Sequence, residues 1–448
     1  MKIVFFANTD WYLFNFRLPY ARYLRSLGHE VVMVSPHGDY GARLEAEGFK
    51  WTALPLARRS LNPVREALLI ARLAAVYRAE RPDLVHHFTI KCVVYGTLAA
   101  RVAGVPSIVN AIAGFGYVFV SARLSARVLR PMVRRLMKMA GDGPGTAVVV
   151  QNADDLAVFR SMGLSAQANL KLIRGSGVDL TRFKPSEQSR LPGPLRVLFV
   201  GRLLHDKGIA EFVDCARRCH DDMPGALRFT AAGEPDNGNP ASVDPALLAQ
   251  WRLEGAVHFA GHVDDMPALL ARADIVVLPS YGEGAPRSLI EAAACAKPLV
   301  ATDVRGCREV VVDGINGLLV PVRNSKRLAE AVMKLADDGP LRARMGEAGR
   351  RHVLATLDEQ IVFKETYRTY EELVAVRSPQ LASRTPSQIA MESTEGPSSV
   401  TLSFPERRRS VLDGMVAAAD RRARAATDGA VQSSERVSED KDSDRRAA

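Results

Sequence analysis

Short apolar runs alternate along the chain with longer segments whose apolar residues recur at helical spacing. The first run covers residues 3–7, a helical segment follows over 16–27, and residues 30–35 are strand-like again. Further apolar runs in this part of the chain end at Leu84–Val85, Ile108–Val109 and Val148–Val150. Strands that alternate with helices in this way predict βαβ units and a parallel sheet.

The same pattern starts again in the second half of the chain. Short strands are predicted over residues 196–200, 227–231, 257–259, 275–278 and 299–301. Pro185, Pro192 and Pro194 mark a linker between the halves. We therefore expect an α/β protein with two doubly wound domains, at 1–182 and 183–360, and a closing helix at 361–377 that packs back on the N-terminal domain.

The remainder, residues 378–448, differs in composition from the rest of the chain. It has a single aromatic residue, Phe404, and closely mixed charges. Such a segment buries too little apolar surface to fold, so we predict a disordered tail.

The overall composition is that of a globular protein. Of 448 residues, 47% are hydrophobic and 25% are charged, which excludes a collagen-like, coiled-coil or wholly disordered chain. No uncharged apolar run reaches the roughly 18 residues of a membrane-spanning helix, and Asn8 and Asp10 interrupt any signal peptide, so we expect a cytoplasmic protein. The five cysteines are expected to be free thiols, with no disulfide framework and no zinc site.

Positive charge is concentrated in the first part of the chain. Residues 1–184 hold 25 basic and 12 acidic side chains. Six of the basic residues lie between Arg123 and Lys138, a segment with no acidic residue and with apolar residues at helical spacing. A basic amphipathic helix of this kind predicts contact with a membrane surface. The alternative is a helix that packs on the sheet and exposes its basic face to solvent.

The most informative segment, residues 278–294, follows a predicted strand and leads into a helix. Gly282 and Gly284 let the backbone approach a ligand closely, and Pro286 suits the first helical turn, where N–H groups attract phosphate. Glu283 and Glu291 can both project toward one ligand, and carboxylates accept sugar hydroxyls well. The alternative is two surface glutamates near a helix start.

A second loop, residues 200–208, follows the first strand of the same domain. It supplies Arg202 and Lys207, a guanidinium and an ammonium that suit a diphosphate. By itself, a basic loop is commonly just a solvated surface.

Taken together, the motifs of the second half resemble those of the retaining family 4 glycosyltransferases of GT-B fold. In order, they are Gly-Arg-x4-Lys-Gly over 201–208, Gly233-Glu234, Gly261-x-Val263, Ala273-Asp274-x3-Leu-Pro-Ser280, Glu283 with Glu291, and Gly314-x-Asn316-Gly317. The resemblance covers roughly residues 1–375 and implies two Rossmann-like domains that face a cleft.

The resemblance also implies roles for individual residues. Arg202 and Lys207 would hold the donor diphosphate, Glu283 would bind donor sugar hydroxyls, and Glu291 would bind the ribose. Further donor contacts are expected from Gly284, Ala285, Pro286, Arg287, Gly261, Val263 and Glu234. This family commonly has another residue at the position of Ala285, where the expected contacts are backbone N–H groups.

Three segments of the first half, 8–17, 86–91 and 110–119, look like those of family members that act on lipid-linked saccharides. Each follows a predicted strand, at the end of the sheet where ligands bind. His86 is predicted to face the donor sugar across the cleft, although a strand-end histidine is as often structural. The expected acceptor contacts are Asn15, Arg17, Lys91, Gly114, Phe115 and Gly116.

The resemblance implies a retaining, metal-independent transferase without a cofactor. Its donor would be a nucleotide sugar, with uridine as the expected base and a hexose or N-acetylhexosamine as the sugar. Its acceptor would be a polyprenyl-diphosphate-linked sugar at the inner face of the cell membrane, in surface polysaccharide synthesis. The leaving phosphate would take the proton of the attacking hydroxyl.

Four other functions compete with this interpretation. One is a GT-B enzyme with a soluble acceptor or epimerase activity, and another is a nonenzymatic nucleotide-sugar sensor. A dinucleotide-dependent oxidoreductase is disfavoured because no Gly-x-Gly-x-x-Gly follows the strands at Ile3 and Arg196. Nucleic-acid binding is disfavoured because the chain has no recognisable nucleic-acid module.

Overall fold

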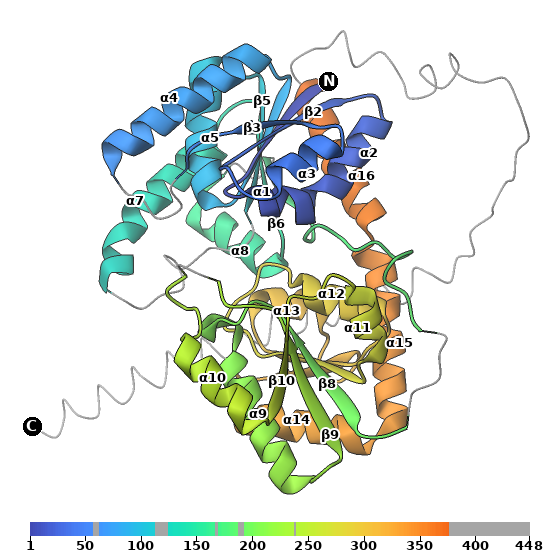
Figure 1. The fold of residues 1–448 in the computed structure, drawn as a ribbon. Helices are drawn as coiled ribbons and strands as arrows, with labels where there is room; N and C mark the ends of the chain where they lie inside the picture. Colours follow the sequence, from blue (N-terminus) through green and yellow to red (C-terminus); the bar gives the residue numbers. More distant parts are fainter. Residues whose placement is uncertain (57–61, 113–123, 166–168, 187–191, 237–238, 376–448) are drawn as a thin grey trace, which may run out of the picture. The chain divides into compact units, whose positions relative to one another are not determined.

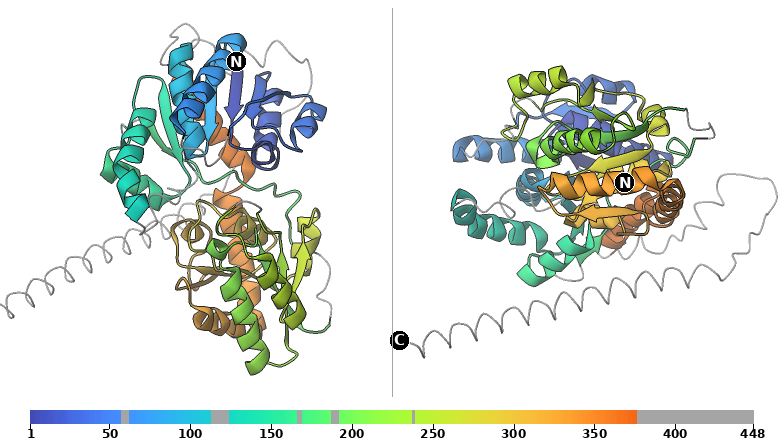
Figure 2. Two further views of the ribbon diagram at one scale, coloured as in Figure 1. Left: turned by 60° about the vertical axis from the view of Figure 1, so that its left-hand side comes forward. Right: turned by 90° about the horizontal axis from the view of Figure 1, so that it is seen from below.

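The computed structural model describes residues 1–56, 62–112, 124–165, 169–186, 192–236 and 239–375. Within them the chain forms two parallel sheets flanked by helices (Figure 1), as Figure 2 shows from two further directions. The N-terminal sheet has the strand order β3-β2-β1-β4-β5-β6-β7, and the C-terminal sheet has the order β10-β9-β8-β11-β12-β13. The order reverses beside the first strand of each half, as in doubly wound folds. The predicted fold class is confirmed.

The N-terminal sheet and its helices are built from the first 172 residues. The strands are β1 (Lys2–Phe6), β2 (Glu30–Ser35), β3 (Lys50–Ala53), β4 (Leu84–Phe88), β5 (Ser107–Ile112), β6 (Thr146–Val150) and β7 (Leu170–Leu172). The α-helices are α1 (Asp10–Tyr12), α2 (Leu18–Ser26), α3 (Gly41–Ala46), α4 (Pro63–Glu80), α5 (Ile90–Ala103), α7 (Leu124–Gly141) and α8 (Ala153–Met162). A π-helical segment, η1 (Leu13–Arg17), connects α1 to α2.

The C-terminal sheet repeats this plan. Its strands are β8 (Leu195–Val200), β9 (Leu227–Ala232), β10 (Val257–Gly261), β11 (Ile275–Leu278), β12 (Leu299–Thr302) and β13 (Gly317–Val320). Its helices are η3, a 3-10 turn (His205–Lys207), then α9 (Ile209–Asp222), α10 (Pro245–Glu254), α11 (Met266–Arg272), α12 (Arg287–Ala294), α13 (Arg305–Val310), α14 (Ser325–Asp337) and α15 (Gly339–Thr356).

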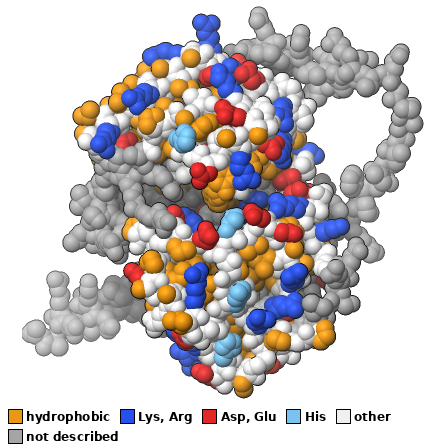
Figure 3. Space-filling model, viewed as in Figure 1, with side chains coloured by type: hydrophobic (Ala, Val, Ile, Leu, Met, Phe, Trp, Pro, Cys, Tyr) orange, Lys and Arg blue, Asp and Glu red, His pale blue; other side chains and the backbone are white. Residues whose placement is uncertain are grey.

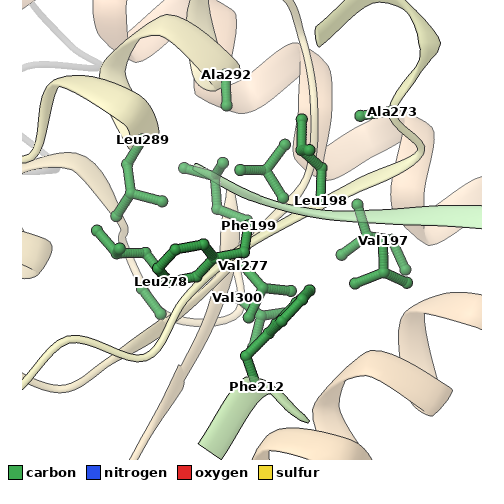
Figure 4. Packing of buried hydrophobic residues seen from close by; sticks show 14 of the residues in the cluster. Val197, Leu198, Phe199, Phe212, Ala273, Val277, Leu278, Leu289, Ala292 and Val300 are labelled. Carbon is green, nitrogen blue, oxygen red and sulfur yellow. The ribbon is translucent and has the colours of Figure 1, made fainter. Parts of the chain in front are cut away.

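Alternate side chains of a strand point to opposite faces, so a strand buried on both sides is apolar throughout. In β1, Ile3 and Phe5 join a core with α2, while Val4 and Phe6 join another with α4. The core of the C-terminal sheet is equally continuous, and Figure 4 shows side chains of β8, α9 and α12 within it. The rings of Phe199 and Phe212 lie 5.5 Å apart there.

The last described helix, α16 (Glu359–Ala375), packs on β5 and β6 of the N-terminal sheet. Val362, Phe363 and Tyr370 of this helix share a core with Phe5. The chain thus returns to its first half after completing the second.

Candidate functional site

Two loops at the carboxyl ends of β8 and β11 lie against each other. A Cβ atom at Gly208, whose φ is +74°, would come within 2.0 Å of the carbonyl oxygen of Pro279. The backbone N–H of Tyr281 donates to the carbonyl oxygen of Asp206, at 2.9 Å. Glycine at position 208 is therefore what allows the basic loop to reach the loop before α12.

This contact brings Lys207 and Glu283 together. Nζ of Lys207 lies 2.5 Å from Oε1 of Glu283, and the two side chains are 23% and 9% exposed. The loop of Glu283 is held in turn by α13, since a Cβ at Gly306 would come within 2.5 Å of the carbonyl oxygens of Glu283 and Gly284. A cation and a carboxylate thus stand side by side at the end of the sheet, on backbone that has little freedom to move.

Arg202 lies at the end of β8, beside the ends of β9 and β10. Its guanidinium pairs with Asp236, and about half of its side chain is exposed. The N–H of Leu203 donates to the carbonyl oxygen of Glu234, and that of Gly233 to the carbonyl oxygen of Gly261. These bonds collect the predicted donor residues at one edge of the sheet. Val263, just beyond them, packs against the core.

The start of α12 carries the remaining predicted donor residues. Nε of Arg287 donates to Oε1 of Glu291 at 2.7 Å, one helical turn later. Glu291 is 7% exposed, and this burial raises the pKa of its carboxyl group, against the opposing effect of Arg287. Pro286 directly precedes the helix. Ala285 is the side chain nearest to Gly175, where a Cβ would come within 3.0 Å of it.

Residues from the N-terminal half reach this loop. The guanidinium of Arg287 donates to the backbone carbonyl of Asn15 and lies 5.2 Å from the ring centre of Phe16. The side chain of Asn152 donates to the carbonyl oxygen of Gly284, at 3.1 Å. Both halves of the chain therefore contribute to the surroundings of the donor residues.

Three of the predicted acceptor residues lie in the described part of the chain, and each has its own contacts. The side-chain amide of Asn15 donates to the carbonyl oxygen of Trp11, at 3.0 Å. Arg17 is 7% exposed, and its guanidinium lies over the ring of Phe88. Nζ of Lys91 pairs with Glu66 at 2.9 Å. Gly114, Phe115 and Gly116 lie outside the described residues.

His86 lies inside the core of the N-terminal sheet. Its side chain is 2% exposed, its Nδ1 lies 2.5 Å from the hydroxyl of Tyr370, and its ring centre lies 4.1 Å from that of Phe88. Burial lowers the pKa of His86 well below its usual range, and the nearby Arg17 lowers it further. Tyr370 and Phe88 thus enclose the ring on two sides, and contact of His86 with the donor sugar stays a prediction.

In the described part of the predicted membrane helix, from Pro131 to Gly141 of α7, four apolar residues point inward. Met137 and Ala140 are buried, and Val133 and Leu136 pack against the same cluster, next to α5. These four residues cover the domain, so any membrane contact of this segment does not involve them. The exposed residues of this part are Pro131, Met132, Arg134, Arg135 and Lys138.

Charge on the described surface is mixed. Figure 3 shows Lys and Arg side chains among acidic ones on the visible face. Among the described residues, no helix is both long enough and apolar enough to cross a bilayer.

Sequence reasoning missed two residues that organise the site. Asp236 pairs with Arg202, and Asn152 caps α8 while its amide reaches the loop of Gly284. Asn152 follows β6 by two residues. Its place at the carboxyl end of a strand is the signal that could have identified it.

Two family profiles match the chain. "Glycosyl transferases group 1" matches residues 182–352, and "Glycosyl transferase 4-like" matches residues 2–142. The chain is 28% identical to the N,N'-diacetylbacillosaminyl-diphospho-undecaprenol alpha-1,3-N-acetylgalactosaminyltransferase of Campylobacter jejuni, over 84% of this chain and 99% of that protein. It is 31% identical to the glycogen synthase of Mycobacterium tuberculosis, over 68% of this chain and 72% of the synthase.

Solved structures share the fold. A crystal structure of Anabaena HepE in complex with UDP aligns with a TM-score of 0.66 and 21% identity, over 83% of this chain and 100% of HepE. Sucrose-phosphate synthase from Thermosynechococcus elongatus aligns with a TM-score of 0.69 and 19% identity, over 84% of this chain and 100% of that one. At this level of identity, both likenesses show the fold alone.

Proposed function

The chain belongs to the group 1 glycosyltransferases, with the GT-B fold, and from this premise we propose that it moves a hexose or N-acetylhexosamine from a UDP-sugar to a lipid-linked saccharide. The transfer proceeds with retention of anomeric configuration and without a divalent metal or other cofactor. The observation that carries the proposal is the Lys207–Glu283 pair on abutting loops beside the start of α12.

The donor is bound at the carboxyl ends of the C-terminal strands. Arg202 and Lys207 contact the diphosphate together with N–H groups at the start of α12. Glu283 accepts hydroxyls of the sugar and Glu291 those of the ribose. Both cations are paired with carboxylates in the structure, so binding exchanges these partners for phosphate oxygens. The name of the relative from Escherichia coli specifies UDP-Gal as its donor, which supports uridine as the base.

The chemical step depends on charge stabilisation. Glycosyl transfer passes through an oxocarbenium-like transition state, while negative charge grows on the departing diphosphate. Arg202 and Lys207 stabilise this charge because they are already in place when it develops. The acceptor hydroxyl attacks on the face from which the diphosphate leaves, and a phosphate oxygen takes its proton.

The acceptor is a sugar on a polyprenyl diphosphate. The names of the relatives from Campylobacter jejuni and Escherichia coli both specify a diphospho-undecaprenol acceptor, and the first relative is covered over 99% of its length. The exposed basic residues of α7 hold the enzyme at the inner face of the cell membrane through anionic lipids. The product enters the synthesis of a surface polysaccharide.

A soluble acceptor is the second candidate. The relative with 31% identity is a glycogen synthase, and other relatives are alpha-maltose-1-phosphate synthases. These names favour a glucan or a sugar phosphate as the acceptor, with the donor bound at the same nucleotide site. Incubation of the enzyme with UDP-sugars and either a lipid-linked saccharide or a glucan separates the two candidates.

The donor assignment can be tested without an acceptor. A ligand that binds only the folded state raises the unfolding midpoint by mass action. We expect UDP and particular UDP-sugars to raise it with or without a chelator, and GDP, ADP and NAD to leave it unchanged. The shift should vanish in Glu291→Ala and persist in the control Glu347→Ala, an exposed carboxylate of α15. Stabilisation by NAD, or by UDP only with a divalent metal, would overturn the proposal.

A further inference from the structure

A guanidinium buried at the end of η1 has no ionic partner in the described segments of the chain. Arg17 is 7% exposed, its Nη2 donates to the hydroxyl of Tyr12 at 2.6 Å, and its Nε finds no hydrogen-bond partner among the described residues. In the described part of the chain, no carboxylate forms an ion pair with it. A buried charge without a counterion is costly. The position of Arg17 therefore suits an anion that arrives with a ligand.

The neighbours of Arg17 belong to the end of β4 and the start of α5. Its guanidinium carbon lies 4.3 Å from the ring centre of Phe88, the last residue of β4. Thr89 follows as the N-cap of α5, a 14-residue helix, but its side chain caps none of the helix N–H groups. The amino end of a helix carries partial positive charge and favours an anion.

His86 adds a second buried nitrogen to this place. Among the residues that the structure describes, none hydrogen-bonds its buried Nε2, whereas its Nδ1 contacts the hydroxyl of Tyr370. Burial raises the pKa of Tyr370, so its phenol stays protonated and can donate to Nδ1. When that hydroxyl donates to Nδ1, the ring proton lies on Nε2, which is then a neutral donor beside Arg17.

Lys91, the second residue of the same helix, differs from Arg17. Its ammonium lies 2.9 Å from Oε1 of Glu66, and both side chains are largely buried. The lysine charge is thus already balanced by a carboxylate of α4. Of the two cations expected to meet the acceptor, Arg17 is the one that forms no ion pair with any residue that the structure describes.

We propose that Arg17, Nε2 of His86 and the amino end of α5 form a binding site for a phosphate group of the lipid-linked acceptor. This inference rests on the proposed function, and it assigns the acceptor phosphate to one corner of the N-terminal sheet. The ion pair between Lys91 and Glu66 links the start of α5 to α4, and in this proposal Lys91 does not bind the phosphate. The guanidinium donates to the phosphate while its face stays on Phe88.

The site can be tested with inorganic pyrophosphate while saturating UDP fills the donor site. Isothermal titration of the full chain should show pyrophosphate binding that weakens about 10- to 100-fold in Arg17→Gln. Arg25→Gln is the matched control, because Arg25 also stacks on a ring of this domain, 4.3 Å from the centre of Phe49, but is exposed. Unchanged binding in Arg17→Gln, or no binding by the wild type once UDP is present, would overturn the site.

Two further measurements separate the possible failures. Should Arg17→Gln unfold, Arg17→Lys keeps the charge but loses the planar donor pair, and we expect intermediate pyrophosphate affinity; wild-type affinity would count against the site. In transfer assays, Arg17→Gln should raise KM for the lipid-linked acceptor and leave KM for the UDP-sugar unchanged. The reverse pattern would assign Arg17 to the donor. Pyrophosphate binding without any transfer would refute the proposed function and leave the phosphate site standing.

Discussion

Nζ of Lys207 lies 2.5 Å from Oε1 of Glu283, although the two residues are 76 positions apart in the chain. The pair joins the loop after β8 to the loop before α12. It balances two charges that would each be costly to bury alone. We assign Lys207 to the diphosphate and Glu283 to the sugar. Before a donor binds, each of these two side chains therefore neutralises the charge of the other.

This pairing predicts the behaviour of single and double variants. Glu283→Ala should lower kcat for transfer by at least about 100-fold, because an interaction with the reacting sugar is lost. Lys207→Met should also weaken UDP binding and lower the free energy of unfolding by about 1–3 kcal/mol, since it leaves a buried carboxylate without its cation. Steady-state kinetics, calorimetry and urea unfolding measure the three effects.

The double variant Lys207→Met/Glu283→Ala serves as the control for stability. It removes both charges, so it should recover most of the free energy of unfolding that Lys207→Met loses. A double variant as unstable as the sum of the two single variants would show that the residues act independently.

Gly208→Ala should separate the two loops. The added Cβ would meet the carbonyl oxygen of Pro279 at 2.0 Å, and backbone cannot move aside as a flexible side chain can. We expect the displaced basic loop to bind UDP at least about tenfold more weakly. A tenfold loss of affinity corresponds to about 1.4 kcal/mol of binding free energy.

A glycine elsewhere in the same domain separates the clash from backbone strain. Gly255 has a φ of +76°, close to the +74° of Gly208, but a Cβ there meets nothing within 4 Å. Gly255→Ala should therefore lower the free energy of unfolding by about 1–2 kcal/mol and leave UDP affinity unchanged. Equal effects of the two variants on UDP affinity would argue against the loop contact.

Much of the fold follows from the sequence because its central strands are buried on both faces and are therefore apolar throughout. Three strands escaped prediction: β3, β7 and β13. Each lies at the edge of its sheet, where a strand has one neighbour and needs fewer apolar residues. The loops that carry Arg202 and Glu283 could be placed because ligands bind at strand ends in such sheets.

Other features depend on contacts that a linear pattern does not contain. The burial of His86 depends on Tyr370, which comes 284 positions later on α16. The partner of Arg202 is Asp236, in the loop after another strand. The apolar residues of α7 recur at helical spacing, and this pattern is typical both of helices that contact a membrane and of helices that pack on a protein core. The neighbouring α5 supplies the core for the described part of that helix.

The exposed basic residues of α7 should bind anionic vesicles. With Val133 and Met137 turned inward, attraction should be mainly electrostatic, at about 1 kcal/mol for each basic residue near the surface. Arg135→Gln/Lys138→Gln should weaken sedimentation with phosphatidylglycerol vesicles, and added salt should weaken wild-type binding. Arg228→Gln/Arg252→Gln removes the same charge from exposed positions of the C-terminal domain and should bind like the wild type. Wild-type binding that withstands high salt would contradict the electrostatic contact.

Glu359 should make the stability of the protein depend on pH. It begins α16, where a Cβ at Gly177 would come within 2.4 Å of its Cα, and its N–H donates to the carbonyl oxygen of Val178. Burial, followed by the negative charges of Asp179 and Asp358, raises the pKa of Glu359 from 4.5 to about 7. The folded state therefore holds the proton more tightly than the unfolded state, and this contribution to stability is complete below about pH 4.5.

Between pH 4.5 and pH 7 the unfolded state gives up this proton while the folded state keeps it, so the contribution to stability is lost as the pH rises toward 7. Glu359→Gln keeps the shape of the protonated form and cannot ionise. The free energy of unfolding of the wild type, relative to Glu359→Gln, should therefore fall between pH 5 and pH 8, by about 1 kcal/mol after allowance for partial exposure. Urea unfolding at several pH values measures the difference, with the exposed Glu347→Gln as the variant whose difference from the wild type stays flat. A wild type that gains stability relative to Glu359→Gln over this range would mean that a cation, and not the two aspartates, dominates the surroundings of the carboxyl group.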